Sequence, residues 1–210
     1  MSRFSFLLNE VTSHYKKTFN EYGHTAKGAN WNDQSSQYHR FQVIVDLIGR
    51  QNIENNTLAD MGCGSGSFLD FCLRECLSIK KYIGYDILEE PLRSIKNNNN
   101  FDCFDKDLIL SDTPTNNSDY LISSGLFNVK LKAEDFLWQQ YIFSLLDLMY
   151  EKSNLGICFN LFTDKVDWKN DNLFYGCVDN FVSHFQRYKP RNIKIAEDYG
   201  LFEWTLLVEK

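Results

Sequence analysis

The sequence predicts an α/β protein in which a mostly parallel, seven-stranded sheet carries helices on both faces and ends in an antiparallel hairpin. From Glu54 onward, short apolar runs alternate with longer helical patterns, which is typical of a parallel sheet covered on both faces. Two strand-like runs joined by the segment DYGLF close the chain and indicate the hairpin. The length of 210 residues is near that of one large domain, so we expect a single domain over 1–210.

Each expected strand is a short apolar run bounded by turn residues, and each expected helix has apolar residues at helical spacing. We expect core strands at 57–61, 81–86, 101–104, 119–123 and 155–162, and hairpin strands at 192–197 and 203–209. We expect helices at 37–49, 66–78, 89–97, 134–151 and 178–186. The four asparagines at 97–100 end one helix, because asparagine is a poor helix former that tolerates turns. Residues 1–50 are expected to form a helical or lid segment ahead of a core at 54–210.

Composition narrows the classes of partner. Lys and Arg total 22 against 28 Asp and Glu, a net charge of −6 without a basic tract, so we expect no nucleic-acid partner. The six cysteines form no C-x-x-C pair and lie mostly in apolar segments, which indicates reduced cysteines in a cytoplasmic protein. No apolar run approaches the roughly 20 residues of a membrane span, and the N-terminal run is too short for a signal peptide.

The stretch LADMGCGSGSF, Leu58 to Phe68, places a glycine loop between the first strand and a helix. Glycine lacks a Cβ and tolerates positive φ, so such a loop lets the backbone approach a ligand closely. The dinucleotide fingerprint G-x-G-x-x-G fails because Ser67 occupies the position of its third glycine, and a phosphate loop fails because no lysine follows. The remaining pattern is acid-x-G-x-G-x-G, with Asp60 as the acid.

This ordered set resembles the class I S-adenosylmethionine-dependent methyltransferases, which have a Rossmann-like fold. The family's second acid ends the second strand and accepts hydrogen bonds from the ribose hydroxyls, and Asp86 in YIGYD matches it. Its third acid follows the third strand and takes the adenine amino group; FDKDL offers Asp107, with Asp105 as a rival. The resemblance implies S-adenosylmethionine as cofactor, bound by Asp60, Gly62, Cys63, Gly64, Asp86, Ile87, Asp107, Leu108, Ser124, Trp31 and Arg40.

The flanks resemble a narrower subgroup of uncharacterised bacterial methyltransferases that look like small-molecule or glycan-modifying enzymes. The matching segments are YGHTAKGANWNDQSSQYHRF, DYLISSGLFN, FNLFTDKVDW and EDYGLFEW. The resemblance implies a lid or carboxylate clamp formed by Gly23, His24, Trp31, Gln37 and Arg40. Two alternatives stay open: Trp31 either contacts the sulfonium or packs in the interior, and Arg40 either binds the methionine carboxylate or pairs with a surface acid.

Methyl transfer is an in-line displacement at an activated carbon, so the enzyme contributes mainly by positioning and desolvation and has little need of a signature catalytic residue. Polar and aromatic residues are expected around the acceptor at strand ends and in the following loops. They are Ser124, Asn128, Thr163, Asp167, Trp168 and Tyr175. The candidates for a catalytic role are His24, Asn128, Asp167, Tyr175 and His184, although a solvated loop position is the alternative for both histidines. We expect no metal site.

The sequence therefore predicts an enzyme that moves a methyl group from S-adenosylmethionine to oxygen or nitrogen of a small polar or sugar-like acceptor. The chain has SSGLF where amine-methylating enzymes of nucleobases and glutamine have an N/D-P-P-Y/F turn, which disfavours that class. The alternative is a module that binds S-adenosylmethionine or S-adenosylhomocysteine without catalysis. A nicotinamide-dependent oxidoreductase is disfavoured by Ser67 and the hairpin.

Overall fold

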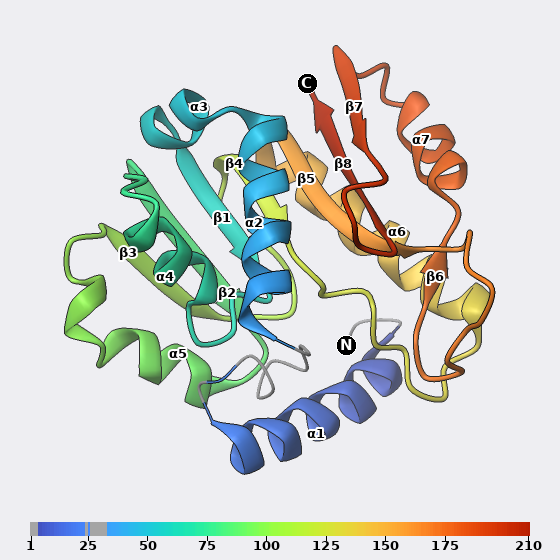
Figure 1. Cartoon of the computed structure of the whole chain (residues 1–210), viewed down its shortest axis with the longest axis horizontal. Coiled ribbons are helices and arrows are strands. Elements are labelled where there is room, and N and C mark those ends of the chain that lie inside the picture. The colour runs from blue at the N-terminus through green and yellow to red at the C-terminus, as the bar shows by residue number, and fades with distance from the viewer. Residues whose placement is uncertain (1–3, 24, 26–32) are drawn as a thin grey trace.

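The computed structural model shows one central sheet with helices on both faces (Figure 1). It describes residues 4–23, 25 and 33–210. The helices are α1 (Ser5–Tyr22), α2 (Gln34–Ile48), α3 (Arg50–Asn55), α4 (Ser67–Arg74), α5 (Glu89–Lys96), the 3-10 helix η2 (Asn99–Phe101), α6 (Asp135–Lys152) and α7 (Val178–Gln186). The strands are β1 (Thr57–Met61), β2 (Lys81–Asp86), β3 (Lys106–Leu110), β4 (Ser118–Ser123), β5 (Ser153–Thr163), β6 (Tyr175–Gly176), β7 (Asn192–Ala196) and β8 (Glu203–Glu209).

The sheet has the predicted layout. Its strand order over the described residues is β3-β2-β1-β4-β5-β8-β7, with the short β6 paired to β5. The strands from β3 to β5 are parallel, and β8 is antiparallel to both β5 and β7. The order in which strands are added to the sheet reverses between β1 and β4, because β2 and β3 lie on one side of β1 and β4 lies on the other. Ligands of open parallel sheets bind outside the carboxyl ends of the strands at such a switch point.

Two apolar layers hold the helices on the sheet. On one face, α2, α4 and α5 pack through residues such as Phe41, Ile44 and Phe68 against Leu58 and Tyr82 of the strands. On the other face, α6 and α7 pack against the opposite side chains of the same strands. The central strands β1 and β2 are almost wholly buried, as expected for a sheet covered on both sides.

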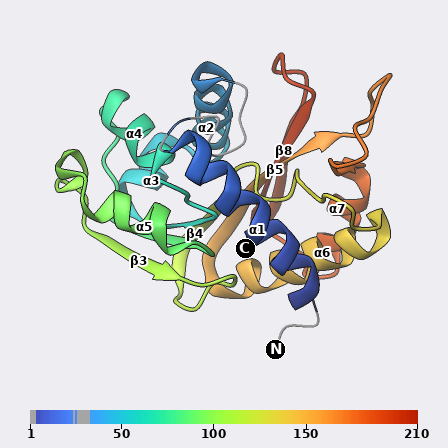
Figure 2. The ribbon, with the colours of Figure 1, turned by 90° about the horizontal axis from the view of Figure 1, so that it is seen from below.

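Helix α1 lies across the carboxyl ends of the strands rather than against either face. Figure 2 shows it in front of the sheet when the molecule is seen from below, with its N-terminal end near α6 and its C-terminal end on the side of α4 and α5. Its buried residues Phe4, Leu7 and Val11 belong to the core that α6 contributes to. This spacing of three and four residues gives one apolar face, and that face covers the switch point.

The predicted third strand is wrong. Residues 99–101 form η2, in which the Asn98 side chain accepts a hydrogen bond from the Asn100 N–H, and the strand follows at Lys106–Leu110. The reason is that β3 is an edge strand whose residues are only partly buried, so it lacks the continuous apolar run that marks β1 and β2. None of the helices that the structure describes is long and apolar enough to span a membrane.

Candidate cofactor and acceptor site

A pocket lies at the carboxyl ends of β1, β2, β3 and β4, beneath α1. Helices α2 and α6 close its sides. Its lining from the strand ends and the loops after them is Asp60, Met61, Gly62, Cys63, Gly64, Ser65, Asp86, Ile87, Leu88, Ser111, Asp112, Ser124, Gly125 and Leu126. Its lining from the helices is Leu8, Val11, Tyr15, Phe19, Gly23, Gln37, Phe41, Ser67, Phe68, Pro91, Trp138, Tyr141 and Leu145. The pocket therefore has a polar floor at the strand ends and an apolar cover.

The glycine loop forms the centre of the floor. The N–H groups of Gly62 and Cys63 both donate to the Tyr85 carbonyl oxygen, at 2.9 and 2.9 Å, which fastens the loop to β2. Gly64 has a positive φ of +54°, and a Cβ built there would meet no atom within 4 Å. A side chain at this position would project into open space in the pocket, so the backbone at Gly64 is available to a ligand.

Asp86 ends β2 and is fixed by the backbone on both sides. Its Oδ2 accepts from the Gly64 N–H at 2.9 Å, and its Oδ1 accepts from the Leu88 N–H at 2.8 Å. Burial raises the pKa of this carboxyl, and the N–H donors act against that rise. A carboxylate offers about four acceptor positions, so Asp86 keeps acceptor capacity for hydroxyl groups of a bound molecule.

Asp60 lies at the end of β1, deeper in the pocket. Its Oδ2 accepts from the Tyr82 hydroxyl at 2.8 Å. Burial raises the pKa of Asp60 to about 7, with the hydrogen bond from Tyr82 acting in the opposite direction and the charge of Asp86 adding to the rise. The carboxyl is therefore partly protonated at neutral pH, and a cation in the pocket would favour its ionised form.

The structure corrects the third acid. Asp107 is the second residue of β3, and its carboxylate pairs with Lys81 Nζ at 2.9 Å at the amino end of the sheet, away from the pocket. Asp105 precedes the strand, and Leu108 packs under the sheet, so neither residue lines the pocket. The displaced strand instead carries Ser111 and Asp112 past its carboxyl end and into the pocket lining. Sequence reasoning missed Asp112 because it placed the third strand too early.

The loop after β4 forms the side of the pocket away from β3. Ser124, Gly125 and Leu126 line it, and Leu126 packs so closely on the glycine loop that a Cβ on Gly62 would lie 2.8 Å from Leu126 Cδ1. Asn128 follows and is 3% exposed. Its Oδ1 accepts from the Phe162 N–H at 3.3 Å, whereas its Nδ2 has no hydrogen-bond partner among the described residues.

The predicted clamp is only partly visible. Gly23 and Gln37 line the pocket, while His24 and Trp31 lie outside the described residues. Arg40 forms an ion pair with Glu203, and both side chains are buried. The pairing alternative for Arg40 is thus the observed one, except that its acid is in the interior and not on the surface.

The predicted acceptor residues after β5 do not reach the pocket. Asp167 and Trp168 are exposed, and the Tyr175 hydroxyl accepts from the Asn170 N–H at 3.1 Å within the same loop. Thr163 ends β5, where its Oγ1 accepts from the N–H two residues on. None of these residues is among those that line the pocket in the part of the chain described.

His184 lies away from the site, on α7. Its ring contacts Asp147 of α6, with 2.7 Å between Nε2 and Oδ1, and stacks on Phe143 at 4.0 Å between ring centres. Burial lowers the pKa of His184, and the nearby carboxylate acts against that change. His184 therefore joins two helices and is no candidate for a base. Among the residues described, no group of three or more His, Cys, Asp or Glu side chains could hold a metal ion.

Solved structures share this fold. The magnesium protoporphyrin IX methyltransferase of Synechocystis PCC 6803, solved with bound S-adenosylmethionine, matches with a TM-score of 0.58 and 12% identity over 84% of this chain and 80% of that one. A SAM-dependent methyltransferase of Archaeoglobus fulgidus matches with a TM-score of 0.58 and 14% identity over 85% and 95%. The fold is that of the class I S-adenosylmethionine-dependent methyltransferases.

A sequence relative shows the family. The chain is 31% identical over 161 residues to the protein named "Putative methyltransferase Rv1506c" of Mycobacterium tuberculosis, which covers 73% of this chain and 93% of that protein. The chain therefore belongs to this family of methyltransferases. No family model matches the sequence.

Proposed function

We propose that the protein transfers the methyl group of S-adenosylmethionine to oxygen or nitrogen of a small polar or sugar-like acceptor, in the cytoplasm. The observation that carries the cofactor site is Asp86, a buried carboxylate held by two backbone N–H groups beside a glycine that faces open space. A ribose diol needs a fixed carboxylate, and a glycine without Cβ leaves room for the nucleoside. The residues present therefore fit the cofactor.

The strand order suggests how the cofactor lies. With the ribose at Asp86 on β2, Ile87, Ser111 and Asp112 at the ends of β2 and β3 would hold the adenine. Asp60 and Gly125, which line the pocket after β1 and β4, would hold the methionine arm. Asp60 provides negative charge for the cationic end, and Asp112 takes the place that the sequence assigned to Asp107.

When bound, S-adenosylmethionine supplies a methyl group activated by its sulfonium for in-line displacement. The chain contributes position and exclusion of water: Tyr141 and Trp138 of α6 and Tyr15 of α1 close the apolar side of the pocket. Burial keeps the Tyr15 hydroxyl neutral by raising its pKa above the ordinary value. Positioning of reactants in a dry site accounts for a large part of such catalysis.

Two side chains after β4 support a polar acceptor. Ser124 Oγ and Asn128 Nδ2 are buried and have no hydrogen-bond partner within the described part of the chain. Leaving such groups unmatched costs about 1–3 kcal/mol each, and a bound acceptor with hydroxyl or carbonyl oxygens would recover that cost. Of the two, only Ser124 is among the described residues that line the pocket, so Ser124 is the candidate that contacts the acceptor, with its hydroxyl donating to an acceptor oxygen.

The cytoplasmic location is supported by the thiols. All six cysteines are free, and burial raises the pKa of Cys63, Cys72 and Cys158, so these thiols stay protonated and unreactive. A reducing compartment suits such residues.

An acceptor screen tests the proposal. The protein is incubated with methyl-labelled S-adenosylmethionine and panels of sugars, small phenols, small amines, proteins and RNA, and transfer of label is measured. We expect transfer to a small polar molecule, lowered at least tenfold in Ser124→Ala. Transfer to protein or RNA alone would contradict the small-molecule proposal, and tight cofactor binding with no transfer to any panel would favour the non-catalytic module.

A further inference from the structure

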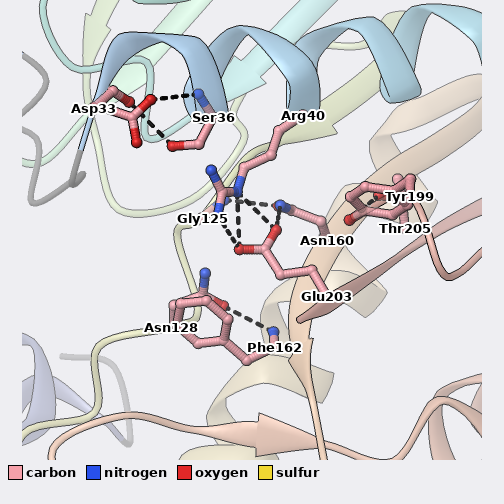
Figure 3. Close-up of polar contacts among 10 residues, drawn as sticks. All are labelled: Asp33, Ser36, Arg40, Gly125, Asn128, Asn160, Phe162, Tyr199, Glu203 and Thr205. Carbon is pink, nitrogen blue, oxygen red and sulfur yellow. Dashed lines mark hydrogen bonds and ion pairs between the residues drawn. The ribbon is translucent and has the colours of Figure 1, made fainter. Parts of the chain in front are cut away.

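Four polar groups, from three elements and the loop after β4, form a buried hydrogen-bonded chain beside the pocket. Arg40 of α2 donates to Glu203 of β8 through Nε, at 2.8 Å to each carboxylate oxygen, and through one terminal nitrogen, at 2.6 Å to Oε1. Asn160 of β5 donates from Nδ2 to Glu203 Oε2 at 2.7 Å, and its Oδ1 accepts from the Gly125 N–H at 2.8 Å. Figure 3 shows Arg40 reaching from its helix toward Glu203, with Asn160 beside the carboxylate.

The donors and acceptors of this hydrogen-bonded chain can pair in one way only. The Gly125 N–H needs an acceptor, so Oδ1 of Asn160 faces it and Nδ2 must face Glu203. Glu203 receives hydrogen bonds from both Arg40 and Asn160, as an ionised carboxylate can because it only accepts. Glu203 is 2% and Asn160 1% exposed, so water does not replace these partners. A buried ion pair is weak evidence for a gain in stability, because the cost of desolvating both charges offsets their attraction.

One end of the hydrogen-bonded chain, Gly125, lies in the pocket lining, and the other end, Arg40, lies on a helix that contributes a neighbouring residue to that lining. Gly125 lines the pocket between Ser124 and Leu126, and Leu126 packs on Gly62 of the glycine loop. At the other end, Gln37 lines the pocket one helical turn before Arg40 on α2. The buried chain therefore joins the helix at one side of the pocket to the loop after β4 through the sheet.

We propose that Arg40, Glu203 and Asn160 are positioning residues of methyl transfer, which hold the loop Ser124–Leu126 in place against the methionine arm of the cofactor. The inference rests on the proposed function, because that function directs the methionine arm toward β4. It differs from the clamp that the resemblance implied, since Arg40 acts through Glu203 and Asn160 instead of binding the methionine carboxylate. Asn160 touches neither cofactor nor acceptor and acts only through the Gly125 N–H.

The test compares two ligands that differ in the amino-acid arm. S-adenosylhomocysteine carries the full arm, whereas 5′-methylthioadenosine keeps the nucleoside and the sulfur alone. Calorimetric titration of Asn160→Ala should show S-adenosylhomocysteine affinity lowered at least tenfold and methylthioadenosine affinity changed less than twofold. A general loss of stability would lower both affinities together. The control Asn192→Ala removes an Asn–Glu hydrogen bond of 3.1 Å between β7 and β8 and should change neither affinity.

Two further measurements keep the test decisive if Asn160→Ala does not fold. The double variant Arg40→Met, Glu203→Met removes both buried charges, and it should show the same selective loss for S-adenosylhomocysteine. In the wild type, the Gly125 amide should exchange with solvent at least tenfold more slowly than the Gly200 amide, which lies in the exposed hairpin turn. Equal losses for both ligands, no loss, or fast exchange of the Gly125 amide would overturn the inference.

The failure of the proposed function gives a different result. If wild-type protein bound neither ligand, the cofactor site itself would be wrong, whereas wild-type binding with an unaffected Asn160→Ala variant would overturn the positioning role alone.

Discussion

Asp60 is a buried carboxyl in the pocket that we propose binds the cationic cofactor. Its pKa is raised to about 7 by burial, so it is partly protonated at neutral pH in the free protein. Ionisation increases as pH rises through this value, and a cationic ligand binds more favourably to the ionised form. We therefore expect affinity for S-adenosylmethionine to increase several-fold between pH 5.5 and 7.5. Titration calorimetry at a series of pH values measures it, and the increase should vanish in Asp60→Asn.

The predicted strand at 101–104 makes Asp107 a pocket residue, whereas the observed strand β3 makes Asp112 one, so substitutions of the two residues should have opposite effects. Asp112 lines the pocket, whereas Asp107 pairs with Lys81 at the other end of β3. Asp112→Ala should weaken S-adenosylhomocysteine binding about tenfold because a partner for adenine is lost. Asp107→Ala should leave it unchanged, since an exposed ion pair contributes about 0–1 kcal/mol to stability and none to the pocket. The reverse order of effects would contradict the corrected site.

At this scale the sequence predicted the residues that follow clear strands. Asp60 and Asp86 end strands whose bounds match the prediction, and both line the pocket. The prediction that Asp107 lies in the cofactor site was wrong, because its strand lies at the sheet edge and has no apolar run to mark its bounds. Glu203 could not be assigned a role, because its partners Arg40 and Asn160 are far apart in sequence and meet only through the fold.

Helix α1 is the longest of the described elements that the sequence analysis did not assign. Within the N-terminal segment the sequence indicated a helix only at 37–49, whereas α1 spans Ser5–Tyr22. It has neither an N-cap hydrogen bond from a side chain nor an acidic residue in its first turn, so the usual start signals are missing. Its apolar face is buried only once the strand ends that it covers have come together.

The cover formed by α1 predicts a role for Tyr15. The side chain is partly buried and lines the pocket, and burial of its hydroxyl, together with the charge of Asp86, raises the pKa of Tyr15. Tyr15→Ala should weaken S-adenosylhomocysteine binding about tenfold, because it opens the cover above the ribose position. Phe6→Ala is the matched control, since Phe6 belongs to the same helix and is 56% exposed. Equal S-adenosylhomocysteine affinities in the two variants would contradict a role of α1 in the site.

At the scale of the whole molecule, the alternation of strands and helices in the sequence predicted the fold class. Apolar runs and turn residues predicted the mostly parallel sheet and the C-terminal hairpin, because buried strands and hairpins carry local signals. The order of the strands and the position of α1 depend on contacts between distant segments, which local patterns do not encode. The family relationship at 31% identity agrees with the predicted class, while the acceptor is set by the pocket and not by the fold.

The most direct test of the cofactor site is a calorimetric titration of wild-type protein, Asp86→Ala and Glu89→Ala with S-adenosylhomocysteine, beside a titration with reduced nicotinamide dinucleotide. Glu89 is exposed and pairs with Arg93 on α5, so its variant controls for loss of charge near the site. We predict micromolar binding to wild type and to Glu89→Ala, at least tenfold weaker binding to Asp86→Ala, and none of the dinucleotide. Wild-type protein that binds the dinucleotide and not S-adenosylhomocysteine would contradict the account.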